Sequence, residues 1–150
     1  MLLQVFNCVF ADSTVELVNI AVNKAAFASS YTSGHSPQYM NDGNADTYFE
    51  SGTSSYTADA VIDLGNKYET VKIYFTAKDG DGEVKIYGSN DIGLKEKTLI
   101  AEVYENGGYD VSGSFRYIIA EKKGKLKISE LEVYAEETQE KQDNSLMVIS

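Results

Sequence analysis

The chain has 150 residues, 43% of them hydrophobic, and a formal net charge of −10. This length is enough for one domain that buries about 68–70% of its unfolded surface, and the hydrophobic content excludes an intrinsically disordered protein. An acidic protein of this size repels phosphate backbones and anionic lipid headgroups, which argues against nucleic acid and membrane surfaces as partners.

The first 11 residues form an apolar run that allows two interpretations. Val9 and Ala11 are small residues of the kind that precede a signal-peptidase cut, but no basic residue precedes the run. It is therefore either a truncated signal peptide or a first strand that packs on the domain. A cut after Ala11 would remove Cys8, the sole cysteine, and leave a chain suited to an oxidising exterior. We expect no membrane insertion, because no apolar stretch approaches about 20 residues.

Beyond this run, short apolar segments separated by turn signals predict a series of β-strands. An edge strand is expected within residues 22–30, followed by turn residues up to Pro37. Gly65 and Asn66 are expected to end the strand at residues 60–64. No 3.6-residue periodicity is present, which predicts an all-β antiparallel jelly-roll β-sandwich. The further strands are expected at residues 60–64, 71–75, 84–89, 99–104, 115–120 and 126–134.

A loop at residues 40–51 has the chemistry of a cation site. Asp42 and Asn44 place oxygen atoms on either side of Gly43, which permits a sharp turn. Glu130, at the start of the last predicted strand, could bind the same ion from the other end of the domain. The alternative is an ordinary Asx turn, which is common for these residue types.

Little in the sequence points to catalysis. His35 is the only histidine, and no Gly-x-Ser-x-Gly motif accompanies it. Glycoside hydrolysis needs two carboxylates in a defined arrangement, and the 23 acidic residues by themselves do not establish one. The sequence therefore favours a binding module over an enzyme.

Several blocks of the sequence, in order, resemble discoidin-like domains of the coagulation factor V/VIII C-terminal type. Many bacterial members of that family are carbohydrate-binding modules. The resemblance implies a galactose-binding-like jelly roll, which we expect to occupy residues 12–135 and to be followed by a polar tail or linker at 136–150. The blocks are residues 19–30, 42–51, 60–65, 86–91, 115–118 and 128–134.

The resemblance also implies one structural calcium ion. The family's side-chain ligands match Asp42 and Glu130, and Phe49 stands where the family usually has tryptophan. The remaining ligands would be mainly backbone oxygens. The full implied set is Tyr39, Asp42, Asn44, Thr53, Ser129 and Glu130.

The family's sugar site is matched less well. Galactose-binding members use a histidine, arginines and an aromatic platform on the loops, but the loop between Thr76 and Glu83 has no arginine. Arg116 lies in a block where the family's arginine is more often structural. A tyrosine could stack on a sugar or simply pack its loop. The candidate ligand-binding residues are Tyr56, His35, Lys78, Asp79, Asn106 and Tyr109.

These observations predict a secreted or cell-surface, non-catalytic carbohydrate-binding module with a structural calcium ion, belonging to a larger extracellular protein. Its expected partner is a glycan, with galactose-type sugars among the candidates. Two alternatives stay open at this point: an adhesion domain of the discoidin type without sugar specificity, and a small glycan-active enzyme.

Overall fold

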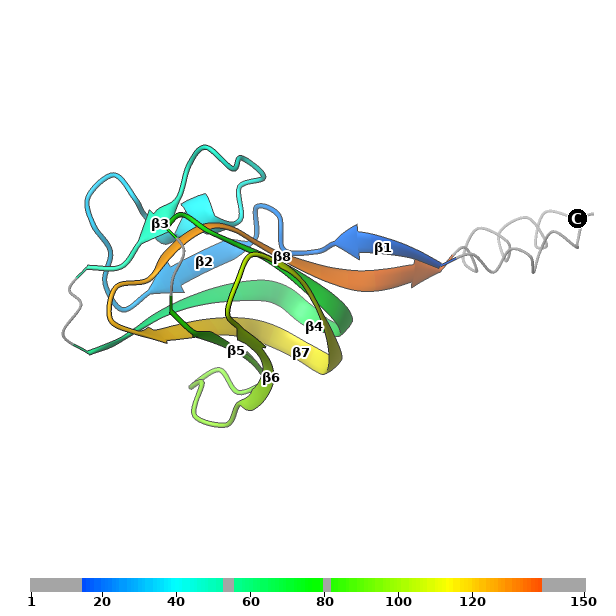
Figure 1. The fold of residues 1–150 in the computed structure, drawn as a ribbon. Coiled ribbons are helices and arrows are strands. Elements are labelled where there is room, and N and C mark those ends of the chain that lie inside the picture. Colours follow the sequence, from blue (N-terminus) through cyan, green and yellow to red (C-terminus); the bar gives the residue numbers. More distant parts are fainter. Residues whose placement is uncertain (1–14, 53–55, 80–81, 139–150) are drawn as a thin grey trace, which may run out of the picture. The chain divides into compact units, whose positions relative to one another are not determined.

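The computed structural model describes residues 15–52, 56–79 and 82–138, and these form an all-β fold (Figure 1). A compact unit spans Asn19–Ala135, and the two chain ends form a second unit. Residues 1–11 and most of the tail expected at 136–150 fall outside the described residues, and the last strand continues to Thr138. The domain boundaries stay predictions. No helix in the described ranges is long and apolar enough to span a membrane. The elements are β1 (Val15–Asn19), β2 (Ala25–Ala28), the 3₁₀ helix η2 (Pro37–Met40), β3 (Phe49–Glu50), β4 (Thr57–Ala77), β5 (Val84–Ser89), β6 (Thr98–Val103), β7 (Gly107–Lys123) and β8 (Lys127–Thr138).

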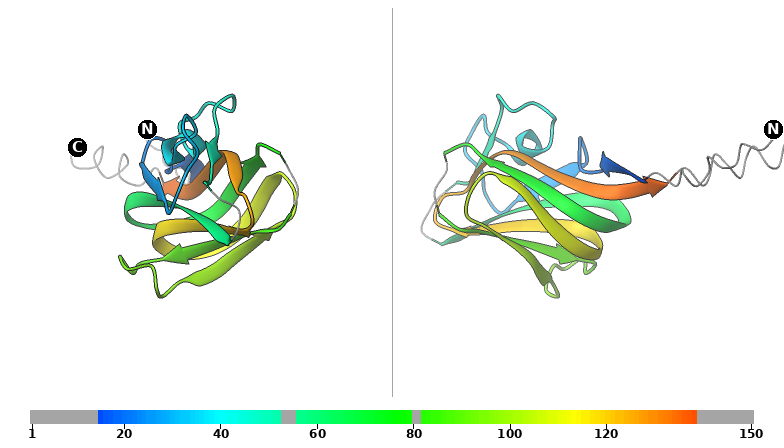
Figure 2. Two further views of the ribbon diagram at one scale, coloured as in Figure 1. Left: turned by 90° about the vertical axis from the view of Figure 1, so that its left-hand side faces the viewer. Right: turned by 45° about the vertical axis from the view of Figure 1, so that its right-hand side comes forward.

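Two long strands, β4 and β7, join the layers of a sandwich. The first part of β4 pairs with β2 and with the last part of β7, which continues to β5 and then β6. Residues 70–77 of β4 pair with β8 along one edge, where the first part of β4 pairs with β2. Along the other edge, this second part of β4 pairs with residues 107–113 of β7. All these pairings are antiparallel, and Figure 2 shows the layers from two further directions. The predicted jelly-roll sandwich is confirmed.

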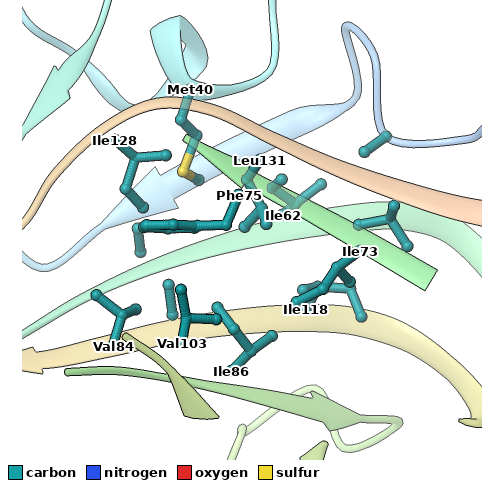
Figure 3. Packing of buried hydrophobic residues seen from close by; sticks show 14 of the residues in the cluster. Met40, Ile62, Ile73, Phe75, Val84, Ile86, Val103, Ile118, Ile128 and Leu131 are labelled. Carbon is teal, nitrogen blue, oxygen red and sulfur yellow. The ribbon is translucent and has the colours of Figure 1, made fainter. Parts of the chain in front are cut away.

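The core lies between the layers because alternate strand positions turn inward. Ile62 and Ile118 come from one layer and Ile73 and Leu131 from the other, and all four are at most 1% exposed (Figure 3). Phe49, at the position the family usually gives to tryptophan, is fully buried. The short segments η2 and β3 therefore hold the loops that follow them against the sandwich.

One predicted strand end was wrong. Gly65 and Asn66 lie inside β4, which runs through both predicted segments, 60–64 and 71–75. The register moves from Asp63 opposite Tyr117 to Tyr68 opposite Phe115, so β4 bulges outward at this point. Gly65 has φ +88°, and its N–H donates to Asp63 Oδ1 at 2.9 Å. The glycine thus supplies a bulge where a turn was expected.

A second strand is longer than its apolar run. β6 ends at Val103, and β7 already begins at Gly107, eight residues before the apolar run at 115–120. Its first part is polar and glycine-rich, and it pairs with β4 from Phe75 back to Thr70. Only Tyr109 and Val111 of this part pack against the core, and backbone pairing across the sheet extends the strand where apolar residues are few.

Candidate functional site

The predicted cation loop, between η2 and β3, is folded around Asp42. The N–H of Asn44 donates to Asp42 Oδ1 at 3.0 Å, and the Thr47 hydroxyl donates to Asp42 Oδ2 at 2.6 Å. Gly43 has φ +77°, a left-handed conformation that glycine adopts without strain. The Asx turn considered as the alternative is therefore present, and it leaves further lone pairs on the carboxylate.

Asn41 ties this loop to the body of the domain. The side chain is 1% exposed, and its Nδ2 donates to the carbonyl oxygens of Ala21 at 2.8 Å and Lys24 at 3.0 Å. Among the described residues, its Oδ1 is a buried oxygen without a hydrogen-bond partner. The loop that carries Asp42 is thus held by side-chain bonds at its first residue.

Glu130 of β8 meets this loop. The residue is 6% exposed, and its Oε1 accepts the N–H of Gly43 at 3.1 Å. Burial raises the pKa of Glu130 to about 7, and its hydrogen bond to Asp42 and the charge of that carboxylate act in the same direction. The structure therefore brings together two carboxylates that are 88 positions apart in the sequence, and a cation between them would remove their repulsion.

The structure places some of the other implied calcium ligands, but one of them lies outside the described residues. Tyr39 lies in η2, Ser129 is buried beside Glu130, and Thr53 lies outside the described residues. The carbonyl oxygen of Asn44 already accepts a hydrogen bond from the N–H of Thr47 at 3.2 Å. Within the described ranges, no three His, Cys, Asp or Glu side chains form a metal-binding group. Asp42 and Glu130, the two carboxylates that the structure brings together at this loop, are hard oxygen donors of the kind that Ca²⁺ prefers.

Two of the predicted ligand-binding residues, His35 and Lys78, lie against the ring of Tyr48, the last residue of the cation loop, and a third is next to Lys78 in the chain. The His35 and Tyr48 rings stack with centroids 4.1 Å apart and an interplanar angle of 22°. The Lys78 ammonium lies 5.3 Å from the Tyr48 ring centroid, a cation–π distance. Asp79 follows Lys78 and pairs with Lys127 at 2.9 Å. Sequence reasoning missed Tyr48, although an aromatic residue beside the buried Phe49 was a usable signal.

Further charges surround these rings. Glu50 Oε2 accepts from Lys125 Nζ at 2.9 Å, and this bond holds the pKa of Glu50 below its usual value. Lys127 lowers the pKa of Asp79 in the same way. The surface therefore offers ammonium donors and carboxylate acceptors beside an aromatic pair, a combination suited to a polyhydroxylated ligand. We call the following residues the Tyr48 cluster: His35, Tyr48, Glu50, Lys78, Asp79, Lys125 and Lys127.

The other three predicted ligand-binding residues lie apart from this cluster or serve the fold. Tyr56 is 82% exposed and borders a groove of about 480 Å³ with Lys123. Asn106 Oδ1 accepts the N–H of Ala77 at 2.8 Å. Asn106 also lines a cavity of about 20 Å³, room for about one water molecule, together with Asp79 and Lys127 of the Tyr48 cluster. Tyr109 was expected on a solvent-facing loop, but it lies in β7 with its ring against the core and its hydroxyl donating to the carbonyl of Glu105 at 2.6 Å.

Arg116 is committed to an ion pair. Its Nε and Nη2 donate to the two carboxylate oxygens of Asp63 at 2.8 and 3.0 Å. This bidentate bond joins β7 to β4 at Asp63, where the β4 bulge begins, and it lowers the pKa of Asp63. The only arginine of the chain is thus structural, the role its sequence block suggests.

Comparison with known proteins identifies the fold. No family model matches the sequence, and no curated protein is significantly similar to it. Among solved structures, chitosan-binding module 1 of a chitosanase/glucanase from Paenibacillus sp. IK-5 superposes with a TM-score of 0.69 at 21% identity, covering 79% of this chain and 99% of the module. Module 2 of the same enzyme, in complex with chitotriose, gives 0.69 at 24% identity over 78% and 100%.

A third similar structure is a family 32 carbohydrate-binding module of NanJ from Clostridium perfringens, in complex with galactose. Its TM-score is 0.66 at 19% identity, and the match covers 79% of this chain and 99% of the module. These likenesses extend over almost the whole of each module. At this level of identity they establish the fold, which is the galactose-binding-like, discoidin-type sandwich that the sequence resembles.

Proposed function

We propose that this chain, which has the discoidin-type sandwich fold, is a non-catalytic carbohydrate-binding module of an extracellular protein. The Tyr48 cluster carries the proposal, because it places aromatic and charged groups side by side at the loops. The fold adds support, since solved modules that share it were crystallised with chitotriose and with galactose.

In this proposal the sugar contacts the exposed parts of His35 and Tyr48 and hydrogen-bonds to Lys78 and Asp79. The lysine donates to ring hydroxyls, and the carboxylate accepts from them. Such a shallow site buries little surface, and Arg116 cannot add a bidentate bond because Asp63 already occupies it. We therefore expect millimolar affinity, about −4 kcal/mol.

We further propose that a structural calcium ion is bound by Asp42 and Glu130 with backbone oxygens completing its shell. The ion would supply positive charge between the two carboxylates. Asp42 already orders residues 43–47 by accepting from Asn44 and Thr47, and Tyr48 follows directly. The role of the site is thus to hold the loop that leads into the sugar-binding cluster.

The decisive test compares glycan binding by two variants. We expect an array followed by calorimetric titration with chitotriose and galactose to detect a ligand for the parent chain. Lys78→Ala should weaken that binding about tenfold, because it removes a donor and a cation–π partner. Lys72→Ala is the matched control: this lysine is in β4 and pairs with the exposed Asp110 at 3.4 Å. Both variants should melt like the parent.

Three results would overturn the proposal. An array without any bound glycan, together with saturable capture of one purified extracellular protein, would establish the adhesion alternative. Release of reducing sugar from a bound glycan would establish the enzymatic one. Equal weakening in Lys78→Ala and Lys72→Ala would show that the sugar does not contact the Tyr48 cluster.

A further inference from the structure

A second surface combines lysines with aromatic rings and shares no residue with the Tyr48 cluster, although Gly82 and Lys122 at its border line the small cavity that Asp79 and Lys127 also line. It is a groove of about 400 Å³ on the outward face of the layer formed by β4, β7 and β5, a size within the range of ligand sites. Val84 and Ile86 of β5 point into the core, so Lys85 and Tyr87 between them point outward. We call this the lysine groove, and its borders include Glu83, Lys85, Tyr87, Glu121, Lys122 and Lys123.

The lysines here stand out against the charge of the whole chain. The protein carries 23 acidic and 13 basic residues, yet lysines outnumber carboxylates along this groove. Of the two carboxylates, Glu121 forms an ion pair with Lys97, and Glu83 accepts from the hydroxyl of Tyr104 at 3.2 Å. Lys85 and Lys123 have no ion pair in the described part of the chain.

Tyr87 is held in place as a wall of the groove. It packs against an outward-facing apolar cluster made of Val61, Tyr117 and Ile119. The Lys97 ammonium lies 4.5 Å from its ring centroid and pairs with Glu121. An aromatic ring fixed in this way loses little conformational entropy when a ligand contacts it.

Tyr56 extends this surface beyond the groove. The shallow hollow that Tyr56 borders shares Thr57 and Lys123 with the lysine groove, so the two are continuous. Tyr56 is 82% exposed, which leaves its ring free to stack on a planar apolar patch. The rings of Tyr56 and Tyr87 and the ammonium groups of Lys85 and Lys123 therefore border one continuous surface.

We propose that the lysine groove, with Tyr56, is a second binding site that takes an anionic oligosaccharide. The sugar rings contact Tyr56 and Tyr87, and their carboxylate or sulfate groups pair with Lys85 and Lys123. Charge alone would suit any polyanion, but the exposed tyrosine next to the lysines favours a ligand that presents both C–H faces and acidic groups. This site shares no residue with the Tyr48 cluster, and the proposal does not depend on the function proposed for that cluster.

The test titrates the full chain with trigalacturonate, with a fully sulfated tetrasaccharide and with neutral maltotriose. We expect one or both anionic probes to bind more tightly than maltotriose, and the comparison between them distinguishes carboxylate from sulfate. Lys85→Gln/Lys123→Gln should weaken the tighter probe about tenfold, corresponding to two exposed ion pairs. The matched control, Lys67→Gln/Lys72→Gln, removes two positive charges from β4 outside the groove and should bind like the parent.

Two further variants separate this site from its alternatives. Tyr56→Ala should weaken the saccharide several-fold without changing the melting temperature, whereas Lys78→Ala in the Tyr48 cluster should leave anionic binding unchanged. The proposal fails if neither anionic probe binds better than maltotriose, if the control pair loses as much affinity as the groove pair, or if Lys78→Ala abolishes binding. It also fails if a hexaglutamate peptide binds as tightly as the saccharide, because that result would show a general polyanion surface.

Discussion

Single carboxylates in this protein have their roles set by what surrounds them. Glu130 is buried beside Asp42, whereas Asp63 is held by Arg116 and Asp79 by Lys127. The first environment raises the pKa of a carboxyl group and the second lowers it. Two predictions follow from these environments.

The first prediction concerns the calcium ion proposed at Asp42 and Glu130. A ligand that binds only the folded chain stabilises it by RT ln(1 + [L]/Kd), about 2.7 kcal/mol at 100 times Kd. Chelation should therefore lower the melting temperature of calcium-loaded protein, and Asp42→Asn or Glu130→Gln should abolish the difference. Asp46→Asn, an exposed carboxylate of the same loop, is the control and should keep it. Identical melting with and without chelator, in protein shown to contain metal, would refute the site.

The second prediction concerns pH and the Asp63–Arg116 pair. The pKa of Asp63 is lowered in the folded state, so its contribution to stability is present above the unfolded pKa of about 3.9 and is lost as the pH falls through the folded pKa. At pH 7, Asp63→Asn should cost about 1 kcal/mol, because Arg116 is partly exposed. Urea titrations should show this difference shrinking below about pH 4. A gap that stays constant down to pH 2 would contradict the assignment.

At the level of elements, the join between β5 and β7 depends on two glycines. The ring of Phe115 lies against Gly88 and Gly113, and a Cβ added at either position would come within 2.4 Å of it. Gly88 thus makes room for a side chain on the neighbouring strand. Gly65 differs, because its φ of +88° requires glycine while no atom lies within 4 Å of its added Cβ.

Gly88 and Gly65 together allow a prediction with an internal control. Gly88→Ala should destabilise the fold by about 3 kcal/mol through overpacking, and Gly65→Ala by about 1–2 kcal/mol through backbone strain alone. In a Phe115→Ala background the cost of Gly88→Ala should largely disappear, while that of Gly65→Ala should not change. Chemical denaturation of the five variants, three single and two double, measures this coupling. Additive costs for Gly88→Ala and Phe115→Ala would show that the ring does not fill this space.

For the whole molecule, the buried apolar side chains of the described part all come from Ala21 to Ala135. A chain that begins at Asp12 should therefore melt within a few degrees of the full chain. A chain that begins at Val22 is the contrasting case, since it lacks Ala21 and also Asn19, whose Oδ1 accepts from the N–H groups of Ala21 at 3.0 Å and Val133 at 3.2 Å. It should melt clearly lower. A large loss already in the chain from Asp12 would show that residues 1–11 pack on the domain.

The sequence by itself determined the fold class and the loop that carries Asp42. Alternating apolar residues and glycine turns are local signals, so they predicted strands from residue 60 onward and a sharp turn at Gly43. Local signals could not predict that β4 continues past Gly65, because backbone pairing with β7 supports a bulge there. Strand length in a sheet depends on the neighbouring strand as well as on the residues themselves.

Only the tertiary structure decided which candidate residues share a surface. It brought His35 and Lys78 to the ring of Tyr48 and paired Asp79 with Lys127, and it packed Tyr109 against the core. It also placed Tyr56 on one surface with lysines from β5 and β7, which no motif or spacing in the sequence predicts. The physical reason is that a binding site depends on distances between loops and strands far apart in the chain, and these distances are set when the two layers pack on a common core.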